Sequence, residues 1–261
     1  MSHLITQKTI RHRLILLSLL LPLIFSLAGC ASMQDWFGFG DSTVQQSADS
    51  LAVEGMDDYH AGKYFAALKS FEEIMDRYPF NPQAMLAELK AADCHYYQEE
   101  FLEAKGLYQE FEDRHPTNEA IPYVMFQIGM CDFNRTDRID RDTSGAINAI
   151  QSFTLLLRAF PNSPYTSEAK ARISAAREFL ANHEYFVAVF YVKTDKFDEA
   201  AYRLKYLLAT YPSSALAPKA QTLLARIEAG NPPEMGLSAW LPDLSMPDWH
   251  LFGSDDDKKS P

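Results

Sequence analysis

Four stretches of the chain share one spacing of apolar residues ahead of a proline. Counting back from Pro79, Pro116, Pro161 and Pro212, an alanine stands twelve residues before each proline, and large apolar residues stand eight and five residues before it. When the residue fifteen before the proline is included, successive positions are 3, 4 and 3 residues apart, which places all four on one face of a helix. The alanine allows close approach of a neighbouring helix, and the proline ends the helix. We call the residues at one offset a row. The rows fifteen, twelve, eight and five residues before the prolines are, in that order, Tyr64, Phe101, Ala146 and Phe197; Ala67, Ala104, Ala149 and Ala200; Phe71, Tyr108, Phe153 and Leu204; and Ile74, Phe111, Leu156 and Leu207.

A second helical pattern precedes each of these helices, so the chain predicts helical hairpins. The expected first helices cover residues 47–61, 83–97, 122–133 and 182–193, and Asn81 and Pro82 form a typical helix start for the second. The prolines lie 37, 45 and 51 residues apart. The 45-residue interval predicts a polar loop at 134–144, and the 51-residue interval predicts an extra helix from 163 to about 181 that continues into the next hairpin. One more helix, 215–229, ends the array.

The hairpin pattern is similar to the tetratricopeptide repeat (TPR), with Gly55, Ala67, Phe71 and Pro79 at the positions of its signature. Strand-like alternation is absent from the sequence. We therefore predict an all-α fold, a TPR-type helical-hairpin solenoid of about four and a half to five repeats. Each hairpin buries its apolar face only against its neighbours, which gives a concave face suited to holding segments of other proteins.

The N-terminus predicts a cleaved lipoprotein signal at residues 1–29. Lys8, Arg11 and Arg13 precede an apolar run at 14–27, which ends in Leu27-Ala28-Gly29-Cys30. This tetrad resembles a lipobox, whose cysteine becomes the lipidated first residue of the mature protein; the alternative is an ordinary signal peptide with a chance cysteine. Several acyl chains on Cys30 would form a durable membrane anchor. Residues 30–46 are then the lipidated cysteine and a flexible linker.

Charge and cysteine content narrow the possible partners. Residues 1–29 contain three of the 24 basic residues and none of the 35 acidic ones, so the mature chain has a formal net charge of −14. That balance argues against nucleic acid as a partner.

Cys94 and Cys131 occupy equivalent places in successive repeats, about 8–10 Å apart on stacked helices. A disulfide tolerates about 7 Å between Cα atoms, so we expect buried free thiols.

Motifs for catalysis are absent from the sequence, which has no phosphate-binding glycine loop, no G-x-S-x-G, no HExxH and no C-x-x-C. Its histidines lack ligand spacing. Adjacent acidic pairs such as Glu72-Glu73 do not face each other on a helix, and the acidic run 255–257 is typical of a solvated tail. We expect no enzyme activity, no catalytic residues, no metal site and no cofactor beyond the lipid on Cys30.

The chain resembles the BamD (ComL) family of outer-membrane assembly lipoproteins over roughly residues 47–229. The lipobox, the insertion at 138–142 and the long helix after Pro161 are the features that point to this family rather than to TPR proteins in general. The matching segments of the long helix are Ser163-Pro164-Tyr165, Phe179-Leu180-Ala181, His183-Glu184, Val187-Ala188 and Phe190-Tyr191. The family often has a complete fifth hairpin, whereas here Gly230-Asn231-Pro232-Pro233 follows the last predicted helix.

The resemblance implies a lipid-anchored periplasmic scaffold of the machinery that assembles β-barrels in the outer membrane. Its N-terminal repeats, 47–162, would receive unfolded barrel proteins. Its C-terminal repeats, 163–230, would contact the barrel-bearing BamA-like subunit, beside other assembly lipoproteins. Ala31 is not the aspartate associated with inner-membrane retention, which fits the outer membrane. The alternative is a TPR lipoprotein that scaffolds cell-wall, Tol–Pal or secretion components.

Candidate binding residues follow from the repeat register. The first helix of each hairpin lines the concave face of TPR arrays, and the positions one, four and five after each small residue point into that groove. The alternative for each such aromatic or methionine is an ordinary core position. The expected substrate groove consists of Met56, Tyr59, His60, Asp93, Tyr96, Tyr97, Met130, Phe133 and Asn134, extended by Tyr123 and Phe126.

Two further regions have open interpretations. Arg203 stands beside the apolar row of the last second helix and is the expected residue at the partner interface, because arginine pairs well with carboxylates; the alternative is a surface arginine with local contacts. Residues 231–261 are rich in proline, tryptophan and aspartate, which is typical of a disordered tail. Alternatively, Trp240 and Trp249 dock on a partner or on the end of the solenoid.

Overall fold

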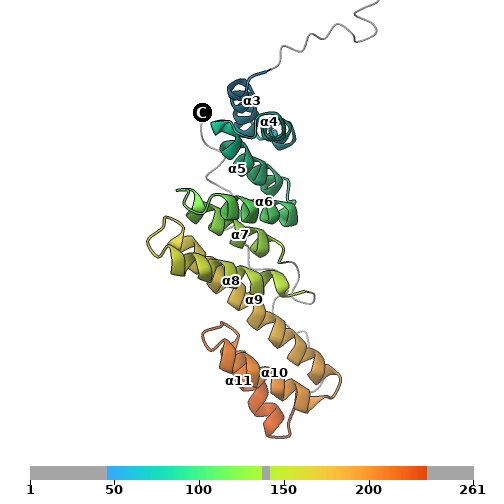
Figure 1. The fold of residues 1–261 in the computed structure, drawn as a ribbon. Coiled ribbons are helices and arrows are strands. Elements are labelled where there is room, and N and C mark those ends of the chain that lie inside the picture. The colour runs from blue at the N-terminus through green and yellow to red at the C-terminus, as the bar shows by residue number, and fades with distance from the viewer. Residues whose placement is uncertain (1–45, 137–141, 234–261) are drawn as a thin grey trace, which may run out of the picture. The chain divides into compact units, whose positions relative to one another are not determined.

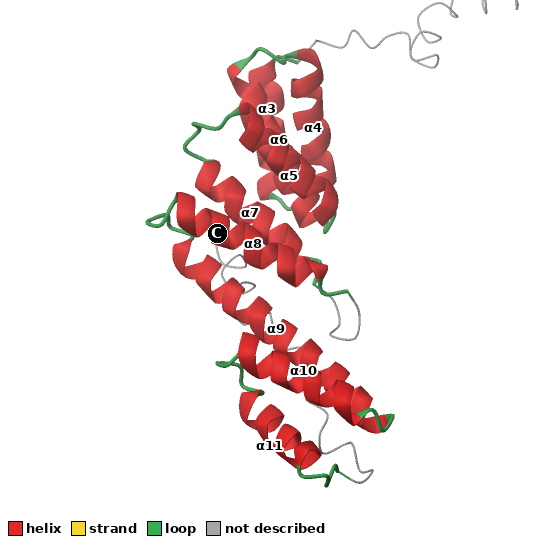
Figure 2. Ribbon diagram, turned by 60° about the horizontal axis from the view of Figure 1, so that its bottom comes forward, coloured by secondary structure: helices red, strands yellow, loops and turns green. Residues whose placement is uncertain are grey.

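The structure is a computed structural model that describes residues 46–136 and 142–233. In these residues the chain forms helices and no strand, which confirms the all-α prediction (Figure 2). The signal segment, Cys30, the linker up to residue 45 and the tail from residue 234 lie outside the described part. The helices are α3 (Ala48–His60), α4 (Tyr64–Arg77), α5 (Pro82–Tyr97), α6 (Phe101–Arg114), α7 (Ile121–Asn134), α8 (Ser144–Ala159), α9 (Thr166–Lys193), α10 (Phe197–Thr210) and α11 (Ala217–Glu228).

Helices α3 to α11 pack in chain order (Figure 1). Each lies against the helix before and the helix after it, and α3 also contacts α5. Contact limited to neighbouring hairpins is the defining property of a helical-repeat solenoid. The hairpins are α3 with α4, α5 with α6, α7 with α8, and the second half of α9 with α10, as the proline register predicts.

The second helix of each hairpin ends in the same way. The residue after the helix is Tyr78, His115, Phe160 or Tyr211, and its backbone N–H donates to the carbonyl four residues earlier, at 2.8–2.9 Å. The following proline disfavours helical φ and ψ at that residue, so the backbone turns extended and the helix stops. The repeated proline therefore sets the C-terminal boundary of α4, α6, α8 and α10.

Three of the four rows predicted from the prolines, those twelve, eight and five residues before them, lie in the core. Every alanine twelve residues before a proline has no exposed surface, and the residues eight and five before are at most 1% exposed. Opposite the aromatic row, the first helices carry small residues. A Cβ at Gly55 would lie 2.8 Å from the Phe71 ring, and a Cβ at Gly129 would lie 2.5 Å from the Phe153 ring. The small residue and the aromatic side chain together set how closely the two helices of a hairpin approach.

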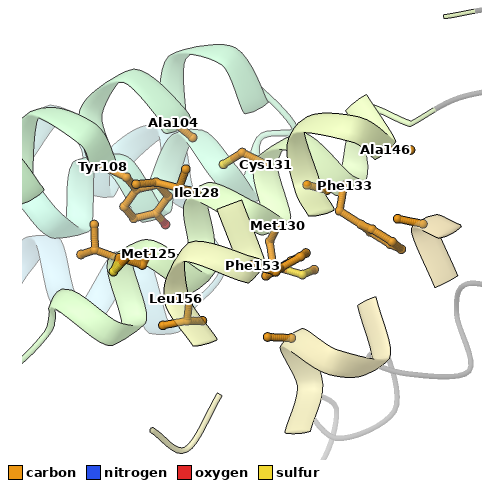
Figure 3. Close-up of a cluster of buried hydrophobic side chains, with 14 of the residues drawn as sticks. Ala104, Tyr108, Met125, Ile128, Met130, Cys131, Phe133, Ala146, Phe153 and Leu156 are labelled. Carbon is orange, nitrogen blue, oxygen red and sulfur yellow. The ribbon is translucent and has the colours of Figure 1, made fainter. Parts of the chain in front are cut away.

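The buried side chains divide into three clusters along the array. The first spans α3 to α5 and the second continues through the first half of α9; the third joins the second half of α9 to α10 and α11. Figure 3 shows the middle cluster around Tyr108 and Phe153. Helix α9 is 28 residues long and contributes to two clusters, which confirms the extra helix expected in the longest interval. The polar insertion separates α7 from α8, and residues 137–141 of it lie outside the described part.

Candidate protein-binding site

Aromatic side chains gather where α3, α4, α5 and α6 meet. The rings of Tyr64 and Tyr97 stack with centroids 4.7 Å apart and an interplanar angle of 11°. Tyr59 meets both rings edge to face, at 5.7 and 5.9 Å. Tyr96 contacts Tyr97 at 5.6 Å and Phe101 at 5.5 Å. Tyr97 remains 41% exposed, so this N-terminal aromatic cluster offers ring surface to a ligand.

A buried carboxylate holds this cluster in place. Asp93 in α5 has no exposed surface. Its Oδ1 accepts hydrogen bonds from the hydroxyls of Tyr108 at 2.6 Å and Tyr123 at 2.7 Å. Its Oδ2 accepts from Lys90 Nζ at 2.8 Å and from the Tyr59 hydroxyl at 3.4 Å. One side chain thereby ties α3, α6 and α7 to α5, and a buried charge with several partners fixes their register.

The tyrosines around Asp93 are held as neutral phenols. Burial is the main cause that raises the pKa of Tyr59, Tyr108 and Tyr123 above the usual value, and the Asp93 carboxylate raises each pKa further. Burial also raises the pKa of Tyr96 to about 12. Each hydroxyl therefore keeps its proton near neutral pH and can donate it in a hydrogen bond.

A second buried carboxylate lies one hairpin further along. Asp132 in α7 has no exposed surface and accepts two hydrogen bonds from Lys105 Nζ of α6, at 2.8 and 2.7 Å. Ser152 of α8 donates to it at 3.3 Å, and Arg135 lies 3.7 Å away. The repeat pattern did not single out Asp132, although an aspartate inside an apolar run (CDF) is a signal for a buried, paired charge.

A second aromatic group joins α7 to the start of α9. Phe126 stacks on Tyr165, with centroids 5.1 Å apart and an interplanar angle of 21°, and Tyr123 lies 5.9 Å from the same ring. The guanidinium of Arg172 sits 5.1 Å from the Phe133 ring centroid. The aromatic surface thus continues from the N-terminal cluster to the long helix.

The predicted groove residues are not equally accessible. His60, Tyr97 and Asn134 are exposed, and five others are half-buried: Met56, Tyr59, Tyr96, Tyr123 and Phe126. Asp93 has no exposed surface, while Met130 and Phe133 are 8% and 6% exposed. A ligand on this face would meet the exposed and half-buried residues directly, and Asp93 would act by holding the tyrosines that donate to it.

The structure adds Tyr64, Phe101 and Tyr165 to the aromatic face, which the groove prediction did not include. Tyr64 and Phe101 are the first residues of α4 and α6, fifteen before the repeat prolines. The apolar periodicity assigns this row to the packing face of the second helices. An aromatic ring at the first position of a second helix, next to the turn of the hairpin, is the signal that could have identified them.

Arg203 of α10 forms a local ion pair. Its Nη1 lies 3.1 Å from Glu184 Oε2 of α9, and the arginine side chain remains 36% exposed. Large apolar side chains of α9 and α10 are more exposed than Arg203: Phe190 is 54%, Tyr202 68% and Tyr206 44% exposed. The C-terminal hairpin therefore presents aromatic rings beside charged groups, a composition typical of protein interfaces.

The two cysteines of the described residues are buried thiols rather than activated ones. Cys94 and Cys131 are free and buried, and burial raises the pKa of each thiol to about 12, which keeps both protonated. Among residues 46–136 and 142–233, no group of three His, Cys, Asp or Glu side chains could hold a metal ion. Nor does any described helix have the length and hydrophobicity to span a bilayer.

Comparison with known proteins gives a consistent result. A family model described as YfiO, outer membrane lipoprotein, matches residues 44–238, which include all described helices. The protein named outer membrane protein assembly factor BamD from Neisseria gonorrhoeae is 27% identical over 209 residues, covering 76% of this chain and 78% of its own. The protein of the same name from Pasteurella multocida is 26% identical, covering 77% of this chain and 78% of its own. The one from Vibrio cholerae is 27% identical, covering 74% of this chain and 86% of its own.

Proposed function

Because the chain belongs to the YfiO family of outer membrane lipoproteins, we propose that it is a scaffold of outer-membrane protein assembly that binds unfolded barrel proteins and a BamA-like subunit. The protein is located at the outer membrane, and its relatives are assembly factors rather than enzymes. The helical array supplies protein-binding surfaces, and the described residues contain no metal cluster.

The N-terminal aromatic cluster is the observation that carries the substrate half of this proposal. Tyr97 exposes 41% of its surface while its ring stacks on Tyr64 and meets Tyr59 edge to face. Pre-positioned rings offer a large contact area at little entropic cost, and they tolerate many sequences. Such a surface suits the targeting strands of unfolded barrel proteins, which would present their own aromatic side chains to it.

Charge distinguishes the two ends of the array. Residues 47–162 contain 20 Asp and Glu against 10 Lys and Arg, whereas residues 163–230 contain 7 acidic and 9 basic residues. A formal charge of −10 on the N-terminal repeats and +2 on the C-terminal ones favours different partners for the two regions. We assign residues 47–162 to the substrate side and residues 163–230 to the scaffold side on this basis.

The C-terminal hairpin would dock the BamA-like subunit. Arg203 keeps a third of its side chain exposed, so a carboxylate of the partner can approach the guanidinium beside Glu184. Exposed Tyr202 and Tyr206 lie on the same helix. The membrane attachment would come from lipid on Cys30, which lies outside the described residues.

Site-specific crosslinking tests the substrate half. Photoreactive probes at Tyr59, Tyr96 and Tyr97 are expected to label a peptide that carries a barrel targeting strand. Probes at Glu72 and Glu112, on the second helices, serve as controls and should not. Equal labelling of both sets, or labelling only near α10, contradicts the assignment. Purification of the lipoprotein from membranes tests the wider role, because recovery with cell-wall or secretion components instead of a barrel-assembly complex would overturn it.

A further inference from the structure

Helix α11 presents a face that is covered in α5 and α7. Thirteen residues after each of Pro79, Pro116 and Pro212 stand Ala92, Gly129 and Ala225. Ala92 has no exposed surface and Gly129 is buried, because the second helix of the same hairpin lies on them. Ala225 is exposed.

The same change occurs at the neighbouring positions of the register. The residues twelve and fifteen after the prolines are fully or nearly buried in α5 and α7, where they are Ala91, Cys94, Ile128 and Cys131. In α11 the equivalents are Leu224 and Ile227, and both are only half-buried. We call Leu224, Ala225 and Ile227 the terminal face. Leu224 and Ile227 pack in part against the buried cluster of α9 to α11, and no described helix follows α11 to cover what remains exposed.

The sequence that follows α11 supplies apolar side chains within reach of this face. In three hairpins, the buried aromatic residue or leucine of the second helix comes 16 residues after the small residue of the first: Gly55 to Phe71, Ala92 to Tyr108 and Ala188 to Leu204. Sixteen residues after Ala225 is Leu241, and Trp240 stands just before it. We propose that the segment around Trp240 and Leu241 packs on the terminal face of α11, where a second helix packs in the hairpins of α5 and α7.

The prolines of this segment determine the form of the contact. A regular second helix would extend across Pro242, which removes a backbone donor and clashes with the preceding turn. The segment therefore covers α11 as an apolar strap and not as a full helix. Trp240 is seven residue steps after Pro233, enough to reach about 23 Å when extended, against a length of about 18 Å for α11.

Charge and tethering favour the chain's own segment over another protein. Residues 234–261 contain six acidic and two basic residues, so they are attracted to the C-terminal repeats, with their net charge of +2, and repelled by the N-terminal ones. A short covalent link also gives the segment an effective concentration in the millimolar range at α11. A separate partner would have to compete with this intramolecular contact.

Single-tryptophan fluorescence of the full-length lipoprotein tests the strap. The substitutions Trp36→Phe and Trp249→Phe leave Trp240 as the only tryptophan. Its emission should be shifted to short wavelength and protected from acrylamide. Adding Ala225→Glu, which fills the terminal face and repels an acidic segment, should move the emission to longer wavelength and increase quenching severalfold. The matched control is Ala209→Glu at an exposed position of α10, which should leave both unchanged.

Two results would overturn the proposal. One is emission typical of a fully hydrated indole before any change at Ala225. The other is a protected Trp240 whose emission responds equally to both glutamates, or to neither. Because Ala225 is exposed, its substitution should not unfold α11, and circular dichroism checks this. A disulfide between Ala225→Cys and Trp240→Cys, absent from the pair of Ala209→Cys with Trp240→Cys, gives independent support, and equal yields contradict it.

Discussion

Gly129 and Gly106 both lie inside helices, but their surroundings differ. A Cβ at Gly129 would lie 2.5 Å from the Phe153 ring, whereas a Cβ at Gly106 would meet nothing within 4 Å. Gly129→Ala should therefore lower the free energy of unfolding by about 1–3 kcal/mol through overpacking. Gly106→Ala is the matched control and should raise it by about 0.5–1 kcal/mol, because alanine favours the helix. Urea unfolding of both variants measures the difference, and loss of stability in both would contradict this account.

Asp93 carries a second prediction at the same scale. Asp93→Ala removes the acceptor of the Tyr108 and Tyr123 hydroxyls and leaves Lys90 without its partner at 2.8 Å. Removing one member of a buried charged network costs about 3–5 kcal/mol. We expect a loss of that size in chemical denaturation. Asp113→Ala on the exposed side of α6 should change stability by less than about 0.5 kcal/mol.

At the scale of the helices, variants of the ion pair between Glu184 of α9 and Arg203 of α10 distinguish an effect on stability from an effect on binding. Arg203→Ala removes both the pair with Glu184 and the proposed contact with the BamA-like subunit. Glu184→Gln removes the pair but leaves the guanidinium available. We expect both variants to lose at most about 1 kcal/mol of stability, because the pair is partly exposed.

Co-purification from membranes then distinguishes the two variants. Arg203→Ala should reduce recovery of the BamA-like subunit, while Glu184→Gln should retain it. Equal loss in both would mean that the arginine acts only through the α9–α10 packing, and unchanged recovery in both would remove Arg203 from the interface.

At the scale of the whole molecule, attachment to the membrane is expected to depend on the sulfur atom of Cys30. Cys30→Ala removes the sulfur that would carry the lipid, and the mature chain has a net charge of −14, which gives it no electrostatic attraction to anionic lipid. The variant should leave the membrane fraction once its signal has been removed. Fractionation at high salt with the processed variant checks this, and retention on membranes would show that another contact is the main anchor.

The sequence by itself determined the fold of the helical array. Proline, alanine and apolar residues at fixed spacings specify helix ends and helix faces, and these are local properties of the chain; the three core rows, the long α9 and the final helix followed from them. The aromatic character of the first helices also follows from the repeat register, because it depends only on residue type and spacing.

Only the tertiary structure decided which of those residues are accessible and what holds them. Tyr97 and Asp93 were equivalent candidates by spacing, yet one is 41% exposed and the other has no exposed surface. The network that joins Asp93 to Tyr59, Tyr108 and Tyr123 connects positions up to 34 residues apart. Hydrogen bonds and burial of this kind depend on how hairpins stack on one another, and a one-dimensional periodicity defines the face of a helix but not the depth of each side chain beneath its neighbours.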